Sequence, residues 1–351
     1  MLPDSAGTAE MSLLRGRAGE RDSHRGAPLR SDGEDFVTLI VYIVVYLLIL
    51  TFIIRCLTRA MVYANAPAHL RWELYPVPHE APQRAGHGGS YFEETDWWKK
   101  PGSKNLTGEM KMMVPEMLFL QGLWEFNRKL WWRSFPFHFG LYLCLLSLFL
   151  LALRAVLSVA VPGAGGGALA TAWTFAYQAA GVLGAVLVIA GAGGLLLRRL
   201  LDSDLRVYTT PADIFNLAFF ACAFAALLGT YALRPAKTVT ALDFARGLLT
   251  FETGLAVPPA MAGAAILGFL LAAYIPFTHM SHFIAKYFTY HSIRWDDVPV
   301  ARRKGLEKKV AEYLTYRPSW AARHVGADGR KTWVDIATSA PQEKPAKGAK
   351  R

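Results

Sequence analysis

Five long stretches of the chain contain no Asp, Glu, Lys or Arg, and this feature constrains the fold more than any other. The stretches cover residues 36–54, 134–153, 155–197, 214–233 and 253–285. A helix needs about 20 consecutive apolar residues to cross the hydrocarbon core of a bilayer. Every one of these stretches is about long enough, so the sequence predicts an integral membrane protein.

The third stretch is too long for a single helix. Pro162 and the glycines that follow it interrupt the stretch, so it holds the end of one helix, a turn and the next helix. The predicted class is therefore all-α, a polytopic membrane helix bundle of about five transmembrane helices. The expected spans are 36–56, 136–159, 171–197, 212–233 and 257–287.

These spans divide the chain into five parts. The expected parts are a disordered tail over 1–35, the first transmembrane helix over 36–56, a loop over 57–135, a four-helix membrane domain over 136–287 and a C-terminal tail over 288–351. The first 35 residues lack the apolar core of a cleaved signal peptide, so the first helix is expected to be an uncleaved signal anchor. The loop ends in an aromatic-rich run over 110–132, which suits an interfacial helix.

The distribution of basic residues predicts the orientation. Most of the 38 Lys and Arg residues fall in the loop over 57–135, the turn over 198–213 and the tail from 286. Because cytoplasmic segments carry an excess of Lys and Arg, we expect the N-terminus outside and the C-terminus inside. The same rule accounts for the net charge of +11 without nucleic acid.

The three cysteines argue against two kinds of metal centre. Cys56, Cys144 and Cys222 all fall in apolar spans or at their ends, and none belongs to a CxxC pair. Iron–sulfur clusters and structural zinc need several clustered thiolates. We therefore expect the chain to hold neither.

Two histidines lie at a similar predicted depth on different spans. His138 is five residues beyond Arg133, and His282 is four residues before Lys286, so both are about 6–8 Å from the last charge on their helix. Imidazole nitrogens on facing helices are suitable axial ligands for haem iron. The pattern favours haem, while hydrogen-bonded helix contacts and an ion, proton or metal site remain open.

His279 is one turn from His282, and it could replace His282 as a ligand or contact a haem propionate or a quinone oxygen. Lys286 is a second weak candidate for such a contact. Pro276 precedes both and is expected to kink the last span. A second haem, nearer the outer face, would need metal-binding side chains at positions 148 and 264. These positions hold Leu148 and Ala264, whose side chains cannot bind a metal, so we expect one haem.

Two motifs carry a family resemblance. The runs SFPFHFGLYL over 134–143 and PFTHMSHFIAKYF over 276–288 resemble the second and fifth helices of the respiratory nitrate reductase gamma-subunit family of cytochrome b. The resemblance implies b-type haem, held here by His138 and His282, and quinol oxidation with electrons passed to a cytoplasmic iron–sulfur partner. It also implies a prokaryotic inner membrane location.

Flanking runs resemble a sub-branch, the Tmc- and Dsr-type transmembrane redox complexes of sulfate reducers. The runs are WELYPVPHE over 72–80, PEMLFLQGLWEFNRKLWWRSFPFH over 115–138, YHSIRWDD over 290–297 and GADGRKTWVDIA over 326–337. This resemblance implies anaerobic respiration with menaquinone, a heterodisulfide-reductase-like iron–sulfur subunit and, in many such complexes, a periplasmic multihaem cytochrome c. The chain would then be an electron-transfer subunit that turns over nothing alone except artificial donors or acceptors.

Two rival functions come from other classes. In the first, the chain is a haem-free membrane anchor whose histidines make helix contacts. In the second, it is a transporter that uses His138, His279 and His282 for metal ions or protons. Transporters often carry internal repeats, and the five spans contain no visible repeat.

Overall fold

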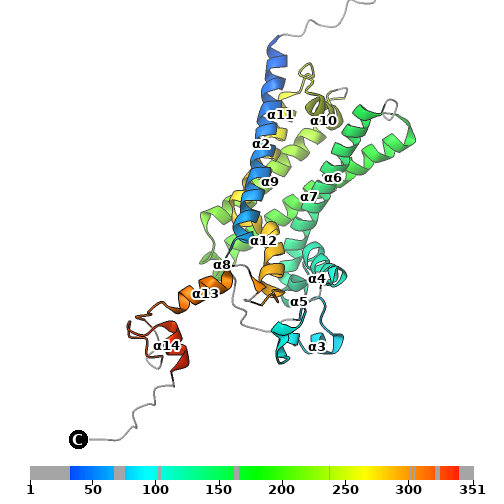
Figure 1. The fold of residues 1–351 in the computed structure, drawn as a ribbon. Helices are drawn as coiled ribbons and strands as arrows, with labels where there is room; N and C mark the ends of the chain where they lie inside the picture. Colours follow the sequence, from blue (N-terminus) through cyan, green and yellow to red (C-terminus); the bar gives the residue numbers. More distant parts are fainter. Residues whose placement is uncertain are drawn as a thin grey trace, which may run out of the picture. The chain divides into compact units, whose positions relative to one another are not determined.

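The computed structural model describes residues 32–66, 76–101, 104–161, 166–236, 238–299, 302–303, 305–320 and 325–339. Of the described residues 77% are helical, and none of them belongs to a strand. Five helices are long and apolar enough to cross a membrane. They are α2 (Asp32–Ala64), α6 (Arg128–Ala160), α7 (Gly167–Leu201), α9 (Pro211–Ala232) and α11 (Pro259–Tyr274) with the turn that follows it (Figure 1). The predicted all-α class with five spans is confirmed, and the orientation stays a prediction.

The chain forms two compact units. The first comprises Met1–Val62 and Met113–Ile284, and the second comprises Tyr63–Met112 and Ala285–Arg351. The tail predicted over 1–35 falls almost wholly outside the described residues, as does the end of the chain beyond 339. The long third stretch is divided between α6 and α7, as the sequence predicts.

Helices α6 and α7 of the first unit approach each other closely because both carry glycine where they meet. A Cβ added to Gly140 would lie 2.7 Å from the carbonyl oxygen of Gly184, and one added to Gly191 would lie 2.5 Å from the backbone nitrogen of Phe137. Small residues allow membrane helices to come into backbone contact. The contact sets the position of α6 over the turn that carries His138.

A cluster of buried apolar side chains lies between α6, α7, α9 and α11. Its members are Phe137, Val188, Ala192, Phe220, Ala223 and Leu271. The Phe137 and Phe220 rings meet edge to face with centroids 5.1 Å apart. The cluster therefore packs one face of α6 at the turn next to His138.

Helix α2 packs against a short helix that the sequence analysis missed. Helix α10 (Ala241–Thr250) follows α9 and precedes α11 in the sequence, and it begins with a capping box formed by Thr240 and Asp243. Along α2, Thr38 donates to the carbonyl oxygen of Leu255 at 2.8 Å, and the Tyr42 hydroxyl donates to that of Glu252 at 3.3 Å. These bonds tie α2 to the segment around α10.

The last span is broken and is not one kinked helix over 257–287. Helix α11 ends at Tyr274, two 3₁₀ turns follow (η3, Ile275–Phe277, and η4, His279–Ser281), and α12 (His282–Phe288) begins afterwards. Pro276 has no N–H to donate to the preceding turn, and the side chain of Thr278 caps η4 by accepting from the nitrogen of Met280. The break sets the direction of His282 independently of α11.

The aromatic run over 110–132 forms two helices and the start of a third. Helix α4 (Leu106–Phe119) ends before Leu120, which has a φ of 53°, and α5 (Gln121–Phe126) ends before α6 begins at Arg128. Within the first unit, Trp131 Nε1 donates to the carbonyl oxygen of Phe119 at 2.7 Å, and the Tyr142 hydroxyl donates to that of Met117. The run is therefore packed back onto α6.

The second unit contains an ion network near its short helix α3 (Pro82–Gly86). Arg84 pairs with Glu80 at 3.0 Å and with Glu94 at 2.6 Å, and Lys100 also pairs with Glu94. Hydrogen bonds from Lys100 and Arg84 hold the pKa of Glu94 below its ordinary value, and the bond to Glu94 raises the pKa of Arg84. At the C-terminal end, α13 spans Leu306–Leu314.

Candidate functional site

His138 is held in one orientation by its own helix. Its Nδ1 lies 2.8 Å from the carbonyl oxygen of Ser134, one turn earlier, and 3.3 Å from the Ser134 hydroxyl. A carbonyl oxygen can only accept, so Nδ1 carries the hydrogen in that bond and Nε2 keeps its lone pair. Histidines that bind metals commonly donate their second N–H in this way.

The structure brings His138 and His282 together across two elements. Their ring centroids are 6.0 Å apart, and the ring planes are inclined by 59°. Two imidazole nitrogens that bind one metal atom each lie about 2 Å from it, which places the ring centroids about 6 Å apart. Rotation about the metal–nitrogen bonds leaves the angle between the rings free. The separation of the pair is therefore compatible with both histidines holding one metal atom.

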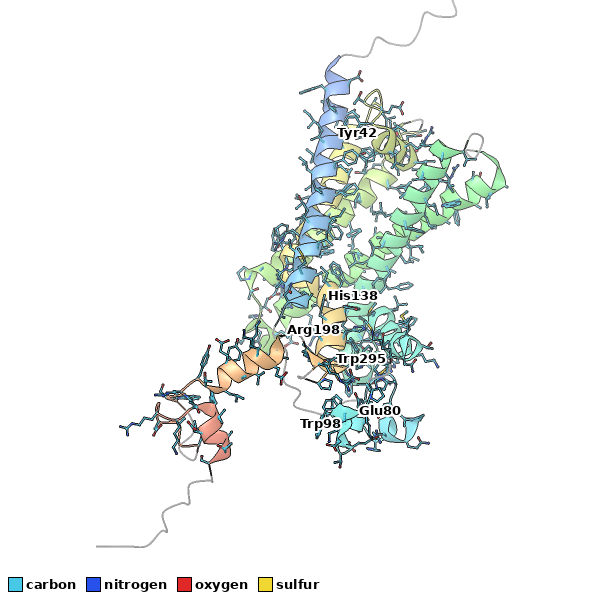
Figure 2. All side chains as sticks on the ribbon, in the orientation of Figure 1. Tyr42, Glu80, Trp98, His138, Arg198 and Trp295 are labelled. Carbon is cyan, nitrogen blue, oxygen red and sulfur yellow. The ribbon has the colours of Figure 1, made fainter. Side chains whose placement is uncertain are left out.

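The surroundings of the pair are largely apolar. The Phe137 ring meets the His138 ring edge to face at 5.5 Å, and Met280 packs against the buried cluster around Phe137. Figure 2 labels His138 on its helix. Such surroundings suit a large hydrophobic cofactor with a polar metal centre.

Side chains of helix α2 contact the break between α11 and α12, just before His282. The interrupted helix leaves carbonyl groups without the usual backbone donor. Arg59 donates from Nε to the carbonyl oxygen of Pro276 at 3.2 Å and from Nη2 to that of Phe277 at 3.5 Å. The guanidinium of Arg55 lies 4.4 Å from the centre of the Phe277 ring. Neither arginine was predicted to contribute to the site.

We expect the Arg59→Leu variant to loosen the His282 turn. Hydrogen bonds from a charged donor contribute about 1.5–3 kcal/mol each, so partly exposed ones should contribute about 1 kcal/mol or more together. The midpoint of thermal unfolding, followed by far-ultraviolet circular dichroism in detergent, should fall. Arg206→Leu is the control, because Arg206 bonds only a nearby carbonyl, that of Leu200. Equal midpoints for the two variants would contradict the role of Arg59.

His279 is directed away from the histidine pair. Its Nε2 lies 3.6 Å from an oxygen of Asp213, its side chain is 61% exposed, and the same carboxylate pairs with Arg199 at 3.6 Å. Asp213 also caps the start of α9 together with Thr210. The break in the last span separates His279 from His282, so the two do not share a helix face as a continuous helix would require.

Lys286 belongs to the second unit, where its Nζ lies 5.4 Å from the centre of the Tyr290 ring. This contact is a cation–π arrangement. The structure therefore gives Lys286 an aromatic neighbour within its own unit, and a quinone role for it stays a prediction.

The two positions considered for a second haem differ in exposure. The side chain of Leu148 is 50% exposed on α6, whereas Ala264 on α11 is buried. A ligand at Leu148 would be directed at least partly out of the bundle. The expectation of one haem stays a prediction.

One buried polar pair had no clear signal in the sequence. The Tyr274 hydroxyl donates to Oδ1 of Asn216 at 2.8 Å, and Asn216 is buried between α9 and α11. Ser134 is different, because a serine four residues before a histidine on a helix is a pattern that could have been found. The Asn216 pair needs the tertiary structure, because 58 residues separate its members.

The donor set distinguishes a bare metal ion from a haem. Among the described residues no group of three or more His, Cys, Asp or Glu side chains could hold a metal ion. A bare ion such as zinc needs three or four protein ligands. The porphyrin of haem supplies four nitrogens to its iron, so the protein needs to provide only one or two ligands. The pair His138 and His282 fits the requirement of haem.

These observations define a multi-pass helical membrane protein with two facing histidines at one end of its bundle. Residues 123–300 match the model of the nitrate reductase gamma subunit family, and the chain belongs to that family. The family consists of haem b-containing membrane cytochrome b subunits of respiratory complexes. Searches of curated proteins and of solved structures found no match to the chain.

Proposed function

We propose that the chain transfers electrons between menaquinol in the membrane and a cytoplasmic iron–sulfur partner, through one b-type haem bound by His138 and His282. The observation that carries this proposal is the facing histidine pair, with its 6.0 Å ring separation, in a chain of a haem b family. The direction of electron flow follows the relative potentials of the quinone and the partner.

The chain's own residues hold and orient the cofactor. The carbonyl oxygen of Ser134 accepts from Nδ1 of His138, which leaves Nε2 available. Arg59 donates to the carbonyl oxygen of Pro276, in the break that precedes His282. When bound, the haem supplies a centre that accepts and gives one electron at a time. Apolar packing by Phe137 and Met280 limits access of water to one side of the pair.

The partner assignment rests on the resemblance of the flanking runs. It points to a heterodisulfide-reductase-like iron–sulfur subunit on the cytoplasmic side and to a periplasmic multihaem cytochrome c in the same complex. The excess of Lys and Arg in the loop over 57–135 and in the C-terminal tail supports a cytoplasmic position for both segments. The resemblance would place the chain in the inner membrane of a sulfate-reducing prokaryote or a relative.

The proposal is tested on purified full-length chain supplied with haem during expression. We expect a pyridine haemochrome assay to count one b-type haem per chain. We also expect menadiol, a soluble analogue of menaquinol, to reduce the haem to an extent set by the two potentials, as followed by the reduced-minus-oxidised visible spectrum.

Three other outcomes would contradict parts of the proposal. Two haems per chain would mean that further ligands exist beside the pair. A haem that dithionite reduces and menadiol does not would remove the quinol from the proposal. A folded chain without haem would favour the haem-free anchor, or the transporter if the chain then moved metal ions or protons across vesicles.

A further inference from the structure

The second unit contains a short helix near its C-terminal end whose apolar side is exposed. Helix α13 begins after Gly305, which has a φ of 78°, a backbone conformation that glycine adopts without strain (Figure 1). Every residue over 307–317 is exposed. The proposed function assigns no role to this helix.

The apolar residues of α13 form one stripe along the helix. Residues three, four, seven or eight positions apart lie on the same side of an α-helix. The residues at this spacing are Leu306, Val310, Tyr313 and Leu314. Val310 is 36% exposed, Leu314 is 39% exposed and Tyr313 is 54% exposed. The part of the chain that the structure describes therefore leaves this hydrophobic stripe open.

The other side of α13 is charged, and the segment around it is basic. Lys308 and Lys309 are exposed on the helix itself. Over 302–317 the sequence has six Lys or Arg residues and two Glu residues, so the formal net charge of the segment is +4. Arg303 is paired with Asp296, which leaves the rest of the segment still positive. Such a segment is attracted to anionic lipid headgroups.

Aromatic side chains continue the exposed surface beyond the end of α13. Tyr316 is 51% exposed and Trp320 is 88% exposed. The backbone nitrogen of Trp333 donates to the carbonyl oxygen of Tyr316 at 3.0 Å, which brings the start of α14 (Trp333–Thr338) next to the end of α13. Trp333 is itself exposed. Tyr and Trp are the residues that proteins concentrate at the level of lipid headgroups.

We propose that α13 and the aromatic residues beside it bind the surface of an anionic bilayer. The apolar stripe enters the headgroup region, and the basic residues of the segment lie at the lipid phosphates. The C-terminal tail then lies along the membrane. This inference goes beyond electron transfer and does not depend on the haem.

Three observations favour a bilayer over a protein as the occupant of the stripe. An apolar stripe bordered by Lys, Tyr and Trp is the pattern of helices that lie in the membrane interface. The net positive charge of the segment complements anionic lipid. Helix α13 also follows the last membrane span in the same chain, so a bilayer is present at high effective concentration and a weak affinity suffices.

The test measures amide hydrogen exchange over 306–314 by mass spectrometry. Full-length chain is compared in nanodiscs of phosphatidylcholine alone and in nanodiscs that also contain phosphatidylglycerol. Both faces of a nanodisc carry the same lipids, so the result is independent of orientation. We expect exchange at least about tenfold slower in the anionic nanodiscs, because a bound helix exchanges only when it opens. High salt should remove most of this difference.

Two neighbouring substitutions form a matched pair. Val310→Glu and Ala311→Glu each add one negative charge in the middle of α13, but only Val310 belongs to the stripe. A carboxylate on the stripe opposes insertion into the headgroup region, so Val310→Glu should abolish the difference between the two kinds of nanodisc. Ala311→Glu should retain most of it. Both variants should keep the haem content of the wild-type chain.

The remaining outcomes would overturn the proposal. Equal exchange of the wild-type chain in the two kinds of nanodisc would exclude binding to anionic lipid. Equal loss of the difference in both variants would mean that the stripe is not the binding surface. Exchange that slows only when a second chain or a partner protein is added would assign the stripe to a protein. Haem is counted on the same samples, so none of these results bears on the proposed function.

Discussion

The His138→Ala variant should fold and insert into the membrane but retain almost none of its b-type haem. Removal of the imidazole takes away one of the two proposed haem ligands, and alanine offers no replacement donor. The same result is expected for His282→Ala, because the two histidines would hold the haem together from two separate elements of the chain. The pyridine haemochrome count per chain should fall from about one to near zero in both variants.

Two further histidines provide matched controls. His279→Ala removes a largely exposed ring beside Asp213, and His87→Ala removes an exposed ring that bonds only the carbonyl oxygen of Gln83. Both variants should keep their haem. Loss of haem from His279→Ala, with retention in His282→Ala, would mean that the ligand on the last span was assigned to the wrong residue.

The second large effect is expected from Gly191→Ala. The added methyl group would lie 2.5 Å from the backbone nitrogen of Phe137, where no side chain can move aside, so α6 and α7 must separate. Overpacking of this kind costs about 1–3 kcal/mol. Because Phe137 precedes His138, separation of the two helices also displaces His138. We expect a lower thermal midpoint and a lower haem content.

The control for this prediction lies two residues away on the same helix. A Cβ on Gly193 would have no atom within 4 Å, so Gly193→Ala should be neutral or should stabilise α7 by up to about 1 kcal/mol through helix propensity. Similar losses in both alanine variants would show that α7 depends on glycine for a reason other than contact with α6.

The five spans and the histidine pair could be predicted because both depend on local sequence. Apolar length identifies a span without knowledge of its neighbours, and the distance of His138 and His282 from the nearest charge gives their level along each helix. The 6.0 Å approach of the two rings agrees with that argument, although it assumed a continuous last helix.

The remaining parts of the site depend on tertiary contacts. Pro276 signalled a kink, but the carbonyls of Pro276 and Phe277 accept hydrogen bonds from Arg59, more than 200 residues earlier, which no local pattern could predict. Helix α10 was missed because its ten residues carry charge, and its Phe244 packs against the distant Tyr42. A cavity in the second unit combines segments near 79 and 291 that no local pattern connects.

The place of His282 at the start of α12 affects how strongly a ligand on it can bind. Helix α12 continues directly into the π-helix Thr289–Arg294, but two 3₁₀ turns separate it from α11, so the order of its first turn does not follow from that of the long helix. His282 is the first residue of α12, so the fraction of time for which the turn is ordered scales the apparent affinity for any metal it ligates. Exchange of a bound cofactor should therefore be governed by the opening of this one turn, while the long helices stay in place.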